Sequence, residues 1–175
     1  NVGANVVWLL SERHGGRFKR AKLEQSLVSD VRIGGEKVVL AFPQTYMNDS
    51  GQAVRALVRH HGIEDLADLV VVHDELDLPI GRLKVKQGGG LAGHNGLRSI
   101  VQHLHDDSFS RVRIGVGKPR SKEHGAGHVL SPPSKRERQE LDIVIEEAAD
   151  AVEMIRSDGI AAAMNRYNTV AEPDP

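Results

Sequence analysis

The sequence predicts an α/β fold, organised as a single domain over residues 1–175 with a mixed β-sheet. Three observations support this prediction. Strand-like segments alternate with helix-like segments along the chain, and one pair of strands has the pattern of a hairpin. The length of 175 residues is enough for one domain with its own core. The composition, 39% hydrophobic and 27% charged, is ordinary for a globular protein.

Five segments have the apolar spacing of an amphipathic helix. In each of them, apolar residues recur at intervals of three and four. Ser50 is expected to cap the second helix, Gly62 to end it, and Asp158-Gly159 to end the fourth. The expected helices cover residues 2–13, 50–62, 97–104, 134–157 and 160–166.

The strand signals are alternation and one continuous apolar run. Residues 27–33 and 37–42 flank Gly34-Gly35, a pattern typical of a β-hairpin. The run 69–72 is continuously apolar and predicts a central, buried strand. Apolar residues alternate with other residues over 82–86 and over 111–117, so each expected strand has one apolar side. In the strand 82–86 the opposite side is basic.

Charge and composition exclude several classes of protein. The net charge of −1 means that the molecule as a whole is not a basic nucleic-acid binder, so affinity for phosphates needs a local patch. The absence of cysteine excludes disulfides and thiolate metal sites. No apolar run approaches the roughly 20 residues of a membrane span. Aromatic residues make up only 3% of the chain, so stacking platforms for bases are scarce.

Asp74 is the first acidic residue after the expected strand 69–72, in the segment His73-Asp74-Glu75-Leu76-Asp77. Open α/β sheets bind ligands beyond the carboxyl ends of their strands. A carboxylate there can orient a catalytic imidazole by accepting a hydrogen bond from one ring nitrogen, which leaves the other free to take a proton. A solvated acidic turn is an equally good interpretation. Metal binding is disfavoured because no second set of ligands follows at a fixed spacing.

Two asparagines stand at positions suited to substrate binding. Residues 88–97, GGGLAGHNGL, surround His94 and Asn95 with glycines and lead into a helix, whose free N–H groups and dipole favour an anion or a developing oxyanion. Asn95 can donate and accept hydrogen bonds at once. The alternative is a glycine linker followed by a helix N-cap. Asn48, between a strand and a helix, has the alternative role of a turn or capping residue.

A basic set of side chains follows the two alternating strands. Singly these cations are solvated, but together they predict a phosphate-binding patch on a nearly neutral protein. They are Arg82, Lys84, Lys86, Arg111, Arg113, Lys118, Arg120 and Lys122.

Four motifs together resemble those of the bacterial-type peptidyl-tRNA hydrolases, in the same order and spacing. The resemblance runs from Asn1 to about Tyr167 and implies a twisted mixed β-sheet packed between helices. It implies hydrolysis of the ester between a peptide and the 3′ end of tRNA, by a cytoplasmic monomer with no metal, cofactor or membrane partner. The motifs are Tyr46–Gly51, His73–Leu78, Gly88-Gly89-Gly90 with Gly93–Leu97, and Arg111–Gly117.

The resemblance also implies roles for individual residues. Asp74 pairs with the catalytic histidine, while Asn48 and Asn95 bind the substrate near the scissile ester and hold the attacking water. The cleft is lined by Tyr46 and Met47, and His94 lies beside the substrate. Lys86 and Arg113 grip the 5′ phosphate of the tRNA.

The sequence departs from the family pattern at two places. Leu91-Ala92 replaces a His-Gly pair, which adds apolar bulk to the glycine segment. The family's general base is the histidine of a Thr-Arg-His-Asn motif, and Asn1 matches the last residue of that motif. We therefore expect the base and the first central strand ahead of Asn1, and expect residues 1–175 alone to be inactive. A catalytically inactive RNA-binding module on the same fold is the alternative function.

Overall fold

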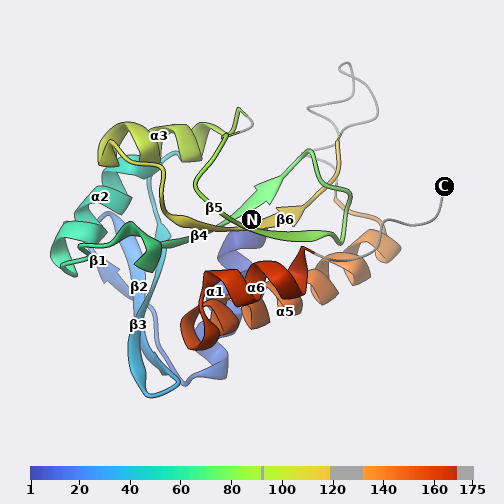
Figure 1. Cartoon of the computed structure of the whole chain (residues 1–175), viewed down its shortest axis with the longest axis horizontal. Coiled ribbons are helices and arrows are strands. Elements are labelled where there is room, and N and C mark those ends of the chain that lie inside the picture. Colours follow the sequence, from blue (N-terminus) through green and yellow to red (C-terminus); the bar gives the residue numbers. More distant parts are fainter. Residues whose placement is uncertain (92, 119–131, 169–175) are drawn as a thin grey trace. The chain divides into compact units, whose positions relative to one another are not determined.

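The computed structural model describes residues 1–91, 93–118 and 132–168 (Figure 1). Ala92, one of the two residues at which the sequence departs from the family pattern, lies outside the described residues. So do Arg120 and Lys122 of the expected basic patch. The α-helices are α1 (Val2–Arg13), α2 (Ser50–His60), α3 (Asn95–Leu104), α5 (Lys135–Asp158) and α6 (Ile160–Tyr167), with short 3₁₀ helices η1 (Met47–Asp49) and η2 (Leu66–Asp68). The strands are β1 (Lys19–Ala21), β2 (Ser26–Ile33), β3 (Glu36–Pro43), β4 (Val70–Glu75), β5 (Leu83–Gln87) and β6 (Ser110–Gly115).

The chain divides into two compact units. Unit 1 consists of Asn1–Val6, Val72–Val85 and the described part of Val112–Pro175. Unit 2 consists of Val7–Val71 and Lys86–Arg111.

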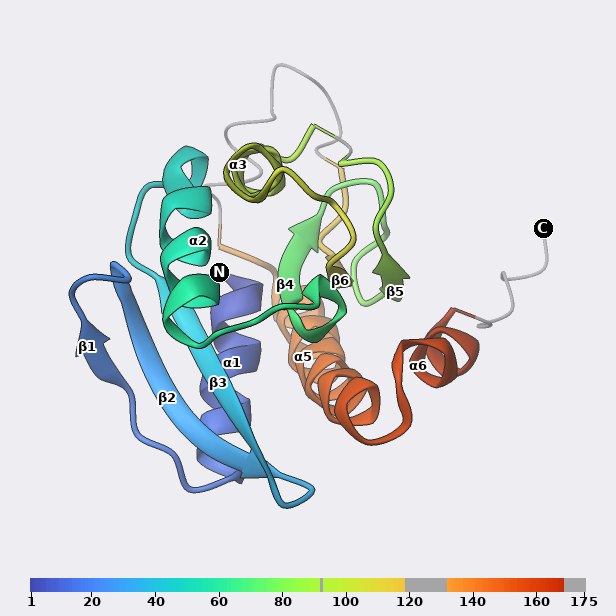
Figure 2. The same cartoon turned by 60° about the vertical axis from the view of Figure 1, so that its left-hand side comes forward.

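The β-hairpin of unit 2 is confirmed. Strands β2 and β3 pair antiparallel from Ser26 opposite Pro43 to Ile33 opposite Glu36, and β1 adds a third strand, in the order β1-β2-β3. Gly34 and Gly35 both have positive φ, which the two-residue turn requires. Helix α1 lies along this sheet (Figure 2), and a buried hydrogen bond of 2.7 Å joins Ser11 Oγ to Ser29 Oγ.

The second sheet has the order β4-β6-β5 and is mixed, as expected. Between β4 and β6 the bonded pairs advance together, from Ser110 N with Leu69 O to Val116 N with Glu75 O, so these strands are parallel. Between β5 and β6 the pairs Gly115 N with Arg82 O and Gly88 N with Phe109 O run in opposite directions, so these strands are antiparallel. The predicted α/β class with a mixed sheet is confirmed.

Two local expectations were wrong. The run 69–72 was predicted to be a central, buried strand, but β4 is at one end of the strand order, and Val70, Val71 and Val72 are only half-buried. The residue before α2 is Asp49, so Ser50 is the first residue of the helix and not its cap. Its hydroxyl instead donates to the carbonyl of Met47 at 2.7 Å, which fixes the turn before the helix.

The long helix α5 of unit 1 begins where the sequence predicts. The Ser134 hydroxyl accepts a hydrogen bond from the N–H of Glu137 at 3.1 Å and caps the helix. At the other end Gly159, with φ of +94°, separates α5 from α6. The side-chain amide of Asn168, just after α6, bonds both the N–H and the carbonyl of Val85 at 2.8 and 2.7 Å. The end of α6 is thereby held to β5.

Helices α2 and α3 pack closely in unit 2 because Gly51 has no side chain. A Cβ at Gly51 would lie 2.1 Å from the carbonyl oxygen of Ser99 and 2.4 Å from Nδ1 of His103. The N–H of Gly51 donates to Ser99 Oγ at 2.9 Å, so α3 supplies a partner for the first turn of α2. Around this contact Val54, Leu97, Ile100 and Phe109 form an apolar cluster, with Leu91 packed against it.

We expect Gly51→Ala to destabilise the fold by about 1–3 kcal/mol or more, because the added methyl group meets backbone atoms that cannot move aside. Urea unfolding measures this free energy. Gly90→Ala is the matched control, since no atom lies within 4 Å of its Cβ position. Equal unfolding free energies for the two variants would contradict the close approach at Gly51.

Candidate active site

Asp74 lies near the end of β4, in unit 1, between two buried side chains. Its neighbours His73 and Glu75 are 5% and 4% exposed, while Asp74 itself is half-buried. His73 Nδ1 donates to the carbonyl oxygen of Asp74 at 2.9 Å, which fixes the local backbone. A half-buried carboxylate in a fixed backbone is well suited to orient another polar group.

The start of α1 packs against the same strand. At Gly3 a Cβ would lie 2.5 Å from the carbonyl oxygen of Val72, two residues before Asp74, so only glycine fits there. The side chain of Asn1 caps the helix, because its Oδ1 accepts a hydrogen bond from the N–H of Ala4 at 3.2 Å. Unit 1 thus holds the beginning of the described chain against β4.

Tyr46, Met47 and Asn48 form the approach to α2 and are all exposed. Tyr46 precedes η1 and is 83% exposed, and Met47 is 49% exposed. Asn48 lies in the middle of η1, with an exposed side chain. Of the two alternative roles, turn residue or helix cap, it has the first: it lies in the turn η1, and Asp49 occupies the cap position of α2.

His94 and Asn95 form the beginning of α3. His94 is the N-cap residue, and its Nδ1 accepts a hydrogen bond from the N–H of Leu97 at 3.2 Å. The N-cap that the sequence offered as an alternative is therefore present, and His94 supplies it. Asn95 is the first helical residue and its side chain is exposed at the positive end of the helix dipole.

Unit 2 brings these two segments together. A Cβ at Gly96 would lie 2.6 Å from the sulfur of Met47, so the side chain of Met47 rests directly on the first turn of α3. Asn48 and Asn95 are exposed residues of η1 and α3, two elements that contact each other. Two exposed amides beside a helix N-terminus can hydrogen-bond a carbonyl oxygen, a developing oxyanion or a water molecule.

Lys86 belongs to the same unit, at the end of β5. Its side chain folds over Gly89, where a Cβ would lie 2.6 Å from Lys86 Nζ. Gly89 has φ of +87°, a conformation that glycine adopts without strain. The glycine segment therefore makes room for the lysine side chain, a contact that sequence reasoning did not anticipate.

Arg111 is not part of an exposed basic patch, and this expectation was wrong. Its side chain is 1% exposed, and Nη1 donates to the carbonyl oxygen of Gly90 at 2.8 Å. The arginine anchors the glycine segment from inside. The alternating pattern places Arg111 on the outward side of its strand, so the sequence did not predict that its side chain is buried.

Arg113, in unit 1, forms an ion pair with Glu75. Nε donates to Oε1 at 3.1 Å and Nη2 makes a second bond to the same oxygen. The two side chains are only 17% and 5% exposed. Lys118 is paired with Asp77 at 3.0 Å. Two cations of the expected basic patch, Arg113 and Lys118, are thus neutralised by carboxylates.

Within the described parts of the chain, no three or more histidine and acidic side chains are grouped so as to hold a metal ion. None of the helices in those parts has the length and apolar character needed to cross a membrane.

Comparison with known proteins agrees with this arrangement. The sequence pattern of the family described as peptidyl-tRNA hydrolase matches residues 1–174. The chain is 46% identical over 165 residues to a peptidyl-tRNA hydrolase of Mycolicibacterium gilvum, covering 94% of this chain and 85% of the relative. It is also 46% identical over 168 residues to one of Rhodococcus opacus, covering 96% and 88%.

Solved structures give the same result. The crystal structure of peptidyl-tRNA hydrolase from Acinetobacter baumannii superposes with a TM-score of 0.88 at 36% identity, covering 97% of this chain and 85% of that one. Identity of this level over nearly the whole chain, together with the shared fold, leads to one conclusion: the chain belongs to the peptidyl-tRNA hydrolase family.

Proposed function

We propose that this chain hydrolyses the ester bond between a peptide and the 3′ end of tRNA, and so recycles peptidyl-tRNA released during translation. The observation that carries the proposal is the packing of η1 against α3, since η1 contains the exposed Asn48 and α3 begins at the exposed Asn95. Membership of the family supports it. An RNA-binding module without catalysis would have no chemical use for the amides of Asn48 and Asn95 or for the carboxylate of Asp74.

The chemistry assigned to these residues is the addition of water to an ester. The amides of Asn48 and Asn95 hold the attacking water and the ester, and the α3 N-terminus stabilises negative charge on the carbonyl oxygen. A histidine base takes a proton from the water as its oxygen bonds the carbonyl carbon. The ester C–O bond then breaks, and the ribose 3′ oxygen leaves with a proton.

Asp74 is assigned as the positioning residue for the histidine base that the family resemblance implies. Its carboxylate accepts a hydrogen bond from one imidazole nitrogen and so keeps the other nitrogen unprotonated toward the water. The backbone at Asp74 is fixed by His73, which supports a role that requires a fixed direction.

Binding of the tRNA is assigned to Lys86 and Arg113, which grip the 5′ phosphate, with Tyr46, Met47 and His94 lining the substrate cleft. The exposure of Tyr46 and Met47 supports this assignment. Arg113 has to serve the phosphate with the part of its guanidinium that Glu75 does not use. We further propose that the chain acts as one domain and as a monomer, in the cytoplasm.

Asp74→Asn is expected to lower kcat for peptidyl-tRNA by about 10²–10⁴-fold, the range typical of general-base assistance, with little change in tRNA affinity. The assay compares single-turnover hydrolysis by chains that include the Thr-Arg-His segment. Asp77→Asn is the control, because this carboxylate is three residues away and paired with Lys118. Equal rates for Asp74→Asn and the parent would contradict the assignment.

Lys86→Ala is expected to weaken tRNA binding and to reduce the slope of log Kd against log salt by roughly 0.7–0.9, the effect of one lost phosphate contact. Hydrolysis of a small ester without a 5′ phosphate is expected to stay at the parent's rate. Lys19→Ala removes an exposed cation from β1 and serves as control. If Lys86→Ala slows both substrates equally, the lysine belongs to the chemistry and not to phosphate binding.

Arg113→Gln is expected to differ from Lys86→Ala by also destabilising the fold, by about 1–3 kcal/mol, because it leaves the buried carboxylate of Glu75 without its guanidinium. Chemical denaturation of the two variants side by side measures this difference. Unchanged unfolding of Arg113→Gln would mean that the ion pair contributes nothing to stability.

A further inference from the structure

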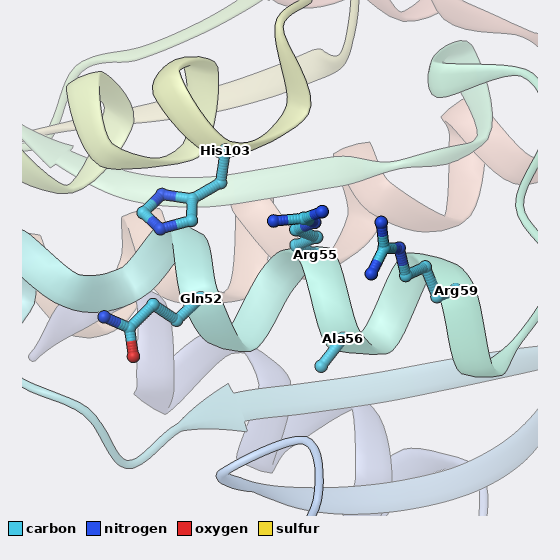
Figure 3. A pocket seen from close by; sticks show the side chains of 5 residues that line it. All are labelled: Gln52, Arg55, Ala56, Arg59 and His103. Carbon is cyan, nitrogen blue, oxygen red and sulfur yellow. The ribbon is translucent and has the colours of Figure 1, made fainter.

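A groove between α2 and α3 is lined by cationic and polar side chains that the proposed chemistry does not use. It has a volume of about 420 Å³ and lies entirely in unit 2. Figure 3 shows Gln52, Arg55 and Arg59 on α2, with His103 pointing toward them from α3. Arg55 and Arg59 are four residues apart, so their side chains follow each other on one helix face, one turn apart.

The two helices that form this groove carry no acidic residue. Helix α2 contributes Arg55 and Arg59, and α3 contributes Arg98. Among the residues that the structure describes, no ion pair involves these three arginines. The nearest acidic residues along the chain are Asp49, before α2, Glu64 and Asp65, beyond α2, and Asp106 and Asp107, beyond α3. A chain with net charge −1 therefore has a local positive surface here.

The imidazole of His103 is held in place by its own helix. Nδ1 donates to the carbonyl oxygen of Ser99 at 2.8 Å, which leaves Nε2 as the second polar edge of the ring. The close approach at Gly51 fixes the distance between the helices at this point. The shape of the groove is therefore fixed by the packing of α2 against α3. His61, beyond α2, adds little positive charge near neutral pH, since burial and the neighbouring His60 lower its pKa.

We propose that this groove binds the phosphodiester backbone of the acceptor arm of the tRNA, close to its CCA end. The inference rests on the proposed function and extends it to a second RNA contact. Guanidinium groups suit phosphate oxygens, and backbone contacts position an RNA duplex without reading its sequence. The groove offers no aromatic anchor other than His103, and its one apolar residue is Ala56, which argues against a protein partner.

The position of the groove along the helices supports this occupant. The same helices begin beside Asn48 and at Asn95, the residues assigned to the ester at the 3′ end. Arg55 and Arg59 follow about one and two turns into α2. An RNA whose 3′ end lies at the helix N-termini therefore has further phosphates within reach of the groove.

The test compares Arg55→Ala/Arg59→Ala with the parent in binding an RNA hairpin that copies the acceptor arm with its CCA end. We expect the slope of log Kd against log salt to fall by about 1.4–1.8, the value for two lost phosphate contacts. Arg55→Lys/Arg59→Lys is expected to restore most of the slope. Arg17→Ala/Arg20→Ala removes two exposed cations elsewhere in unit 2 and is expected to leave it unchanged.

Hydrolysis of an N-blocked aminoacyl ester of adenosine separates this inference from the proposed function. The double alanine variant is expected to cleave it at the parent's rate, because a single nucleoside carries no backbone phosphate for the groove to bind. An unchanged salt slope for the hairpin overturns the inference, whatever the hydrolysis result. So does a loss of binding to polyglutamate with hairpin binding intact, which indicates an acidic protein partner. A parent chain that includes the Thr-Arg-His segment and binds the hairpin as expected, but cleaves neither the adenosine ester nor peptidyl-tRNA, overturns the hydrolase function alone.

Discussion

The close approach of α2 and α3 is the constraint on which the candidate site depends. It requires glycine at Gly51, where a Cβ would meet the backbone of Ser99, and a side chain there would push the two helices apart. Gly96 in turn leaves room for the side chain of Met47, so that η1 rests on the first turn of α3. The positions of Asn48 and Asn95 relative to each other follow from this packing, since neither side chain is buried or held by a core of its own. The packing at Gly51 and Gly96 thus determines where the exposed Asn48 and Asn95 lie.

Neighbouring arginines on β6 show how differently the fold uses the same residue type. Arg111 is buried and donates to the carbonyl of Gly90, whereas Arg113 is paired with the carboxylate of Glu75. Removing a guanidinium from water is costly unless it finds acceptors, so both arginines act first as structural groups. Arg55 on α2 is exposed, so its guanidinium stays hydrated without any loss of solvation free energy and its charge can attract a phosphate.

The sequence predicted the helices well and the environments of charged residues poorly. Helix α1 covers the expected 2–13, and α5 and α6 begin and end within one or two residues of expectation, because apolar periodicity and capping are local signals. Strand β1 was missed, since Lys19-Arg20-Ala21 has no alternation and forms only against β2. The burial of Arg111 and the pairing of Glu75 depend on residues 21 and 38 positions away, which no local pattern encodes.

The candidate site was predictable to the extent that it lies at element ends. Asn95 at a helix start and Asp74 near a strand end follow from sequence order. The contact of Met47 with Gly96 does not, because it joins segments that only the α2–α3 packing brings together.

Charge in this chain is segregated by element, which reconciles a net charge of −1 with a polyanionic substrate. Helices α2 and α3 have basic residues and no acidic ones, whereas acidic residues outnumber basic ones along α5. Because exposed charges are screened within about 10 Å at ordinary salt, an RNA strand responds to the element that it touches and not to the whole molecule. A local patch of two arginines can therefore attract backbone phosphates although the net charge of the chain is close to zero.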